Sequence, residues 1–122
     1  MKFYIQKLEN AGKEKSLVKE LEKAFPHLKF NYQEAANWLA TLVVRDKEDE
    51  FIGEYELTSY NVTKIHYFKS GKNEFDEIIS TEAIRKIYIR FMKKNFSEYR
   101  EDYLKAWNNT VLDNLGELNN EI

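Results

Sequence analysis

The spacing of apolar side chains changes along the chain, and each change marks a different kind of secondary structure. Between residues 13 and 25 apolar side chains recur every three or four positions with charged residues between them, which predicts an amphipathic helix. Pro26 ends this helix, because the residue before a proline disfavours helical geometry. Residues 2–8 fit either a strand or a short helix, and the alternation of Phe3 and Ile5 favours the strand.

Segments typical of strands follow this helix. They are residues 28–33, 37–45, 51–58 and 62–69. The segment 37–45 is apolar on both faces, which predicts an inner place in a sheet or beneath helices. The segment 51–58 has one apolar and one acidic face, and the short connection to 62–69 suits a hairpin. The order of these segments predicts an antiparallel meander.

Helices are predicted in the last third of the chain. Ser80 or Thr81 can cap a helix whose apolar residues recur at helical spacing as far as Met92. Residues 95–97 break the pattern, and aromatic side chains at steps of four predict a second helix over 98–115. We therefore expect an α+β fold: an antiparallel β-meander of four or five strands with helices packed on one face, a two-layer sandwich.

Composition narrows the class of protein. A chain of 122 residues with 43% hydrophobic and 33% charged residues predicts a single globular α+β domain over residues 1–122. The absence of cysteine excludes disulfides, zinc-thiolate sites and thiol nucleophiles. The chain starts without the apolar core of a signal peptide and has no apolar run of about 20 residues, so we expect a cytoplasmic protein that does not contact a membrane. The formal net charge of −2 argues against a domain held on nucleic acid by bulk positive charge.

Residues for catalysis or metal binding are poorly represented. Neither His27 nor His66 has a second histidine or a carboxylate at ligand spacing, so both are expected to be surface or structural residues. The glycines lie too far apart for a phosphate-binding loop. The acidic loop at 46–50 lacks the glycine and the distal glutamate of an EF-hand and is expected to be a solvated turn. We expect a protein that is not an enzyme and that uses no cofactor or metal.

An acidic surface is the first candidate binding site. It comprises a loop, one strand face and a tyrosine in the next turn: Glu48, Asp49, Glu50, Glu54, Glu56 and Tyr60. Alternation along a strand puts Glu54 and Glu56 on the same side, roughly 6–7 Å apart, where their charges repel unless a basic partner arrives. Such a surface suits docking on a cationic groove. The alternative is an edge strand that is charged to prevent aggregation.

A basic surface is the second candidate. It lies on the helix predicted after Thr81 and consists of Arg85, Lys86, Ile89, Arg90 and Lys93. On a helical projection Ile89 is a single apolar residue on a charged face, where it could centre a contact with protein or phosphates. The acidic residues at 98, 101 and 102 would face phosphates in a helix-turn-helix, which argues against specific DNA reading.

These features predict a small non-catalytic protein-binding module. We expect a stoichiometric inhibitor, an immunity protein or a phage anti-defence protein that docks on a larger host protein through the acidic, aromatic-containing surface. The lack of catalytic parts, the 15% aromatic content and a lysine-rich composition typical of AT-rich phages and mobile elements favour this interpretation. The alternatives are a nucleic-acid-binding or transcription-regulating domain that uses the basic C-terminal helices, and an assembly protein that self-associates through exposed aromatic residues.

Overall fold

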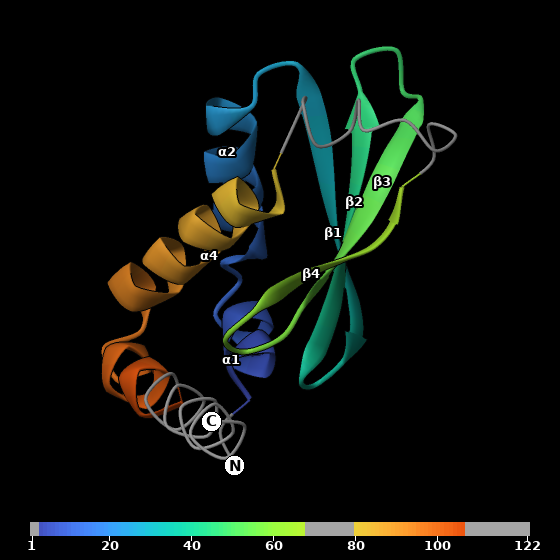
Figure 1. The fold of residues 1–122 in the computed structure, drawn as a ribbon. Coiled ribbons are helices and arrows are strands. Elements are labelled where there is room, and N and C mark those ends of the chain that lie inside the picture. The colour runs from blue at the N-terminus through green and yellow to red at the C-terminus, as the bar shows by residue number, and fades with distance from the viewer. Residues whose placement is uncertain (1–2, 68–79, 107–122) are drawn as a thin grey trace, which may run out of the picture. The chain divides into compact units, whose positions relative to one another are not determined.

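The computed structural model describes residues 3–67 and 80–106. Its helices and strands follow one another as α1 (Tyr4–Asn10), α2 (Glu14–Ala24), β1 (Leu28–Ala36), β2 (Leu39–Asp46), β3 (Phe51–Leu57), β4 (Val62–Tyr67) and α4 (Thr81–Asn95) (Figure 1). Residues 99–106 are helical as well. The predicted continuation of the fourth strand to 69 and of the last helix to 115 lies outside the described residues.

The chain divides into two compact units, Met1–Phe91 and Met92–Ile122, with the boundary inside α4. Unit 1 holds the sheet, α1, α2 and the first part of α4. In unit 2 the rings of Tyr99 and Tyr103 stack with their centroids 5.9 Å apart, and the Lys93 ammonium lies 4.3 Å from the centroid of the Tyr103 ring. The single domain over residues 1–122 stays a prediction.

The four strands form one antiparallel sheet in the order β1-β2-β3-β4, which confirms the α+β prediction and the meander. β2 and β3 are the inner strands. The register aligns Asn31 with Val43 and Val43 with Glu54, so residues of three strands form rows across the sheet. Irregularities in the pairing lie between Glu34 and Ala36, between Val44 and Arg45, and between Glu54 and Tyr55.

Residues 4–10 form a helix, so the prediction of a strand here is wrong. Tyr4, Ile5 and Leu8 are fully buried, and this spacing places them on one side of a helix. Gly12, at φ +67°, reverses the chain after the helix, and its N–H donates to the Glu9 carbonyl. The alternation that favoured a strand rested on Phe3 and Ile5, and Phe3 precedes the helix.

A turn separates the first two strands where the sequence predicted that the second strand begins. Asn37 and Trp38 form this turn, and β2 starts at Leu39. The Trp38 side chain is 51% exposed, so this apolar residue lies in a surface turn and not inside a strand. The Asn37 carbonyl accepts a hydrogen bond of 3.0 Å from the Gln6 N–H, which connects α1 to this end of the sheet.

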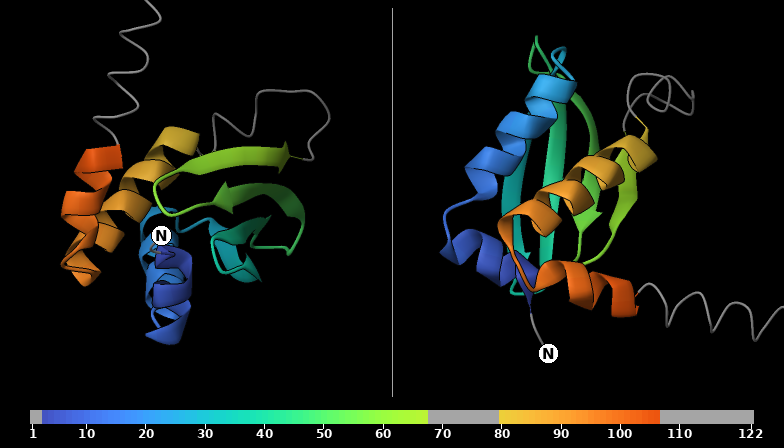
Figure 2. Two further views of the ribbon diagram at one scale, coloured as in Figure 1. Left: turned by 90° about the horizontal axis from the view of Figure 1, so that it is seen from below. Right: turned by 90° about the vertical axis from the view of Figure 1, so that its left-hand side faces the viewer.

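Within unit 1 the helices and the part of α4 up to Phe91 lie on one side of the sheet (Figures 1 and 2). Alternate strand residues are buried with the helix side chains: Leu17, Leu21, Leu28, Phe30, Leu42, Val44, Tyr55 and Leu57. Burial of each large apolar side chain contributes about 1.5–3 kcal/mol. None of the helices within residues 3–67 and 80–106 combines the length and the apolar character needed to cross a membrane.

Candidate functional site

The side of the sheet opposite α1 and α2, here called the outer face, carries both strand residues of the predicted acidic surface. Glu54 and Glu56 lie on it together and are half-buried. Glu54 pairs across the ladder with Val43, and Glu56 pairs with Thr41. β3 runs between β2 and β4, so protection of a sheet edge does not explain these two charges.

The acidic loop at 46–50 is held in shape by hydrogen bonds between its own residues. The Asp46 Oδ1 accepts hydrogen bonds of 2.9 Å from the N–H groups of Glu48 and Glu50. Asp49 has a positive φ of 71°, and its carboxylate lies 3.7 Å from the Lys29 ammonium. The Asp49 carbonyl also accepts a hydrogen bond of 3.2 Å from Arg45 Nη1. The loop is therefore a self-bonded turn in which Asp49 is paired with a cation.

Tyr60 does not share a surface with the strand carboxylates. Its ring packs edge-on against Tyr4, with the centroids 6.0 Å apart. Tyr4 belongs to α1, which lies on the other side of the sheet from Glu54 and Glu56 (Figure 1). The structure thus brings Glu54 and Glu56 together and separates Tyr60 from them.

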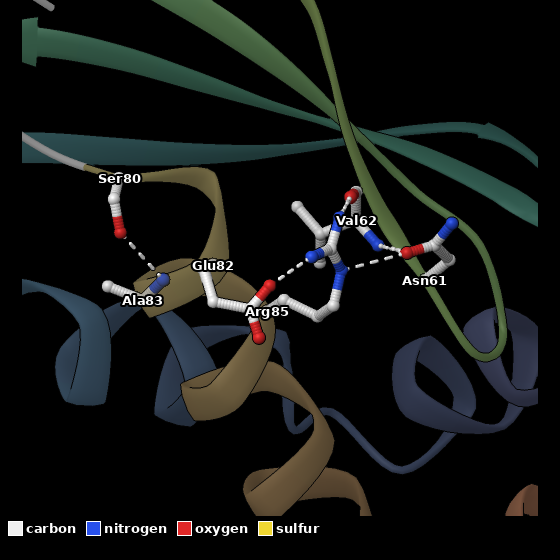
Figure 3. Close-up of polar contacts among 6 residues, drawn as sticks. All are labelled: Asn61, Val62, Ser80, Glu82, Ala83 and Arg85. Carbon is white, nitrogen blue, oxygen red and sulfur yellow. Dashed lines mark hydrogen bonds and ion pairs between the residues drawn. The ribbon is translucent and has the colours of Figure 1, made fainter. Parts of the chain in front are cut away.

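Arg85, the first residue of the predicted basic surface, connects α4 to the turn before β4 (Figure 3). Its Nε donates to Asn61 Oδ1 at 2.9 Å and its Nη2 donates to the Val62 carbonyl at 2.8 Å. It also forms an ion pair with Glu82 one turn earlier. With these bonds made inside unit 1, Arg85 is a structural residue and is not available as a free cation.

Ile89 is buried, with 7% of its side chain exposed, so the prediction of an isolated apolar residue on a charged surface is wrong. Ile87, Tyr88 and Ile89 are three consecutive buried residues, which means that α4 buries more than the single stripe assumed in a helical projection. Lys86, Arg90 and Lys93 are exposed. They are what remains of the predicted basic surface.

A cluster of carboxyl groups, not predicted from the sequence, joins α1, α2 and β1. The Tyr32 hydroxyl donates a hydrogen bond of 3.1 Å to Glu9 Oε1. Partial burial and a hydrogen bond with Glu34 raise the pKa of Glu9 to about 7, and the nearby charges of Glu34 and Glu14 act in the same direction. Burial and these same carboxylates also raise the pKa of Tyr32. The members come from three separate elements, so no sequence spacing could have indicated the cluster.

A groove of about 560 Å³ lies beside this cluster, between α2 and β1. The helix lines it with Glu14, Lys15, Val18, Lys19 and Glu22, and the strand lines it with Phe30, Asn31 and Tyr32. At the far end of the groove Glu22 accepts a hydrogen bond of 3.0 Å from the Phe30 N–H. The groove therefore follows the outermost strand of the sheet.

Metal binding and similarity to known proteins add no further site. Within residues 3–67 and 80–106 no three His, Asp or Glu side chains are arranged to hold a metal ion. No family model, no curated protein and no solved structure matches this chain significantly. Function therefore has to be argued from the surfaces described above.

Proposed function

We propose that this protein is a non-catalytic binding module that docks on a larger protein through the outer face of its sheet. The observation that carries the proposal is that Glu54 and Glu56 lie on an uncovered face without a salt-bridge partner among the described residues. They project from an inner strand onto a face that no helix of unit 1 covers (Figure 1), and neither forms a salt bridge with any described residue.

On the β1 and β2 side no free cation compensates the charge of these carboxylates. Their partners on β2 are the uncharged Val43 and Thr41. The cations Lys29 and Arg45 on the same face are bonded to Asp49. Two adjacent carboxylates held by a rigid ladder repel each other, and a cationic partner surface relieves that repulsion.

The specific form that we propose is a stoichiometric inhibitor, of the immunity or phage anti-defence type, that occupies a cationic groove on its target. The attraction also accelerates association, because complementary charges steer the encounter.

The test compares charge reversals on and off the outer face. Full-length protein carrying Glu54→Lys with Glu56→Lys should bind its partner from a lysate of the source organism at least tenfold more weakly than the unaltered chain. A control with Glu20→Lys and Glu101→Lys makes the same change in net charge on α2 and on helix 99–106. Quantitative pull-down followed by titration of the purified pair measures both. Recovery of no protein partner, or equal weakening by both variants, would refute the proposal.

Nucleic-acid binding is a second candidate, favoured by the exposure of Lys86, Arg90 and Lys93 along α4. The structure reduces its basis, since Arg85 is bonded to Asn61 and Val62. Three exposed cations supply a small electrostatic contribution at physiological salt. Protein docking therefore remains the function that we propose.

A further inference from the structure

The outermost strand β1 presents backbone hydrogen-bonding groups away from the sheet. Along an antiparallel strand, successive residues direct their N–H and C=O groups alternately toward the paired strand and away from it. The Phe30 N–H donates to Glu22 and so points away from β2. By the same alternation the N–H and C=O groups of Tyr32 and Glu34 also point away from β2.

Only part of this edge is satisfied within the protein. The Leu28 N–H donates to the Phe25 carbonyl at 3.0 Å, and the Phe30 N–H donates to Glu22. Among the described residues no hydrogen bond is made by the backbone N–H groups of Tyr32 and Glu34 toward the open side. The regular ladder extends to Glu34, with the irregularity just after it. An open, regular edge of this type is a template for another strand.

The space beside this edge can take the side chains of an added strand. Along the helix side of β1, exposure increases from buried Leu28 and Phe30 to half-buried Tyr32 and exposed Glu34. The groove of about 560 Å³ runs beside Phe30 and Tyr32, with Val18 of α2 on its opposite wall. α2 runs next to β1 in Figure 1 and Figure 2. An apolar side chain that points inward from an added strand would contact Val18.

Lys15 and Lys19 balance Glu14 and Glu22 along the groove itself, whereas three carboxyl groups gather around Tyr32 and favour a basic side chain at this end of β1. The Tyr32 hydroxyl donates a hydrogen bond to Glu9, and Glu34 and Glu14 are close enough to Glu9 to raise the pKa of its carboxyl group. One oxygen of Glu14 is buried without a hydrogen-bond partner in the described part of the chain. Neighbouring carboxylates destabilise one another until a proton or a cation lies between them.

We propose that an extended segment of a protein partner adds to β1 as a further strand, pairs with the backbone of Tyr32 and Glu34, and places a lysine or arginine beside Glu9 and Glu34. The inference rests on the proposed function, because the occupant is part of a protein partner, and it adds the chemistry of that partner. Strand addition obtains affinity from main-chain hydrogen bonds and specificity from alternate side chains. A second copy of the chain is a poorer occupant, because its own β1 brings the same carboxyl groups.

The probe is a phage-displayed library of random nine-residue peptides, panned on the full-length protein, and the most enriched sequence is then synthesised. The expected peptide alternates β-branched or aromatic residues and contains lysine or arginine. On saturation, amide exchange measured by NMR should slow at least tenfold for Tyr32 and Glu34. The amides of Asn31 and Gln33 already pair with β2 and should change less. Enrichment of no peptide, or unchanged exchange at Tyr32 and Glu34, would overturn the inference.

A matched pair of variants isolates the backbone contribution. Glu34→Ala and Glu34→Pro both remove the carboxylate, and only Pro also removes the outward N–H, at an edge position that tolerates proline. The Pro variant should bind the peptide at least tenfold more weakly than the Ala variant, with thermal unfolding confirming that both are folded. Equal affinities would contradict strand addition, and the exchange measurement decides the matter if the Pro variant does not fold.

The remaining outcomes separate this inference from the proposed function. A partner that loses affinity on reversal of Glu54 and Glu56, but leaves amide exchange at Tyr32 and Glu34 unchanged, supports outer-face docking and overturns strand addition. Light scattering that shows a dimer, together with slowed exchange at the same two amides without peptide, assigns the edge to a second copy and also overturns it. Peptide binding at the edge with no effect of Glu54→Lys and Glu56→Lys on the partner refutes only the outer-face proposal.

Discussion

Glu9 connects α1 to β1 through one side chain. It lies near the end of α1, it accepts a hydrogen bond from the Tyr32 hydroxyl on β1, and Glu34 of the same strand raises the pKa of its carboxyl group. Burial and the neighbouring carboxyl groups therefore favour the protonated form of Glu9 in the folded chain.

Stability should consequently fall as the pH rises through the range in which this proton is lost. The pKa of Glu9 is raised from its ordinary value of 4.5 to about 7, so the folded chain binds more protons than the unfolded chain between these values. The stabilisation is complete below pH 4.5 and disappears above pH 7. Glu9→Gln keeps a similar side chain that cannot titrate, and it should flatten this part of the profile. Urea unfolding at pH 5 and pH 8 measures the effect.

The control for this prediction is Glu101→Gln on an exposed position of helix 99–106. It should leave the difference in unfolding midpoint between pH 5 and pH 8 as it is in the unaltered chain. A Glu9→Gln variant with that same difference would show that Glu9 does not hold this proton.

Sequence reasoning failed for residues whose role depends on contacts distant in the chain. Ile89 was assigned to a charged surface from a single helical stripe, whereas α4 buries three consecutive residues there. Arg85 was assigned to a binding surface because its partners, Asn61 and Val62, lie more than 20 residues away. Neither contact leaves a local signal in the sequence.

At the scale of elements, periodicity predicted the strands well and the short segments poorly. The alternation of apolar and acidic residues is realised in β3 from Gly53 to Leu57, because one face of the sheet is buried by helices and the other is not. At the start of the strand Ile52 and Gly53 are both buried, where the pairing with β2 is irregular. α1 has seven residues, too few for a helical period to be distinguished from alternation. Its burial against the sheet, with Tyr4, Ile5 and Leu8 fully inaccessible, decides its conformation.

Attachment of α4 to the sheet should depend on the shape of the Arg85 side chain and not only on its charge. Its guanidinium donates to Asn61 and Val62 simultaneously (Figure 3), and a lysine ammonium cannot reproduce that fork. Arg85→Lys should lower the free energy of unfolding by about 1–2 kcal/mol, the net value of the lost hydrogen bonds. Chemical denaturation measures the loss.

Arg90→Lys is the matched control, since Arg90 is exposed on the same helix. Exposed substitutions of this type usually stay within about 0.5 kcal/mol. If Arg85→Lys and Arg90→Lys cost the same, the two hydrogen bonds do not stabilise the attachment of α4.

At the scale of the whole molecule, the sequence predicted the antiparallel meander but not the character of its two faces. Consecutive strands joined by short turns pair with their neighbours, which gives the order β1-β2-β3-β4. The side on which the helices lie decides that Glu54 and Glu56 are on the outer face and that Tyr60 is not (Figure 1). Which face the helices cover depends on tertiary packing, and no local sequence pattern indicates it.

The turn at 46–50 has a consequence for the order of folding. The N–H groups of Glu48 and Glu50 donate to Asp46 Oδ1, and these hydrogen bonds span at most four residues, so closing the turn costs little chain entropy. We therefore expect the hairpin of β2 and β3 to nucleate the sheet, with α4 docking late.

Asp46→Ala should slow folding about fivefold, equivalent to about 1 kcal/mol, and leave the unfolding rate unchanged. Tyr88→Phe removes the 2.7 Å hydrogen bond to Thr58 and should mainly accelerate unfolding. Stopped-flow measurements in urea give both rates. If α4 docks before the hairpin forms, Tyr88→Phe should slow folding and Asp46→Ala should mainly accelerate unfolding.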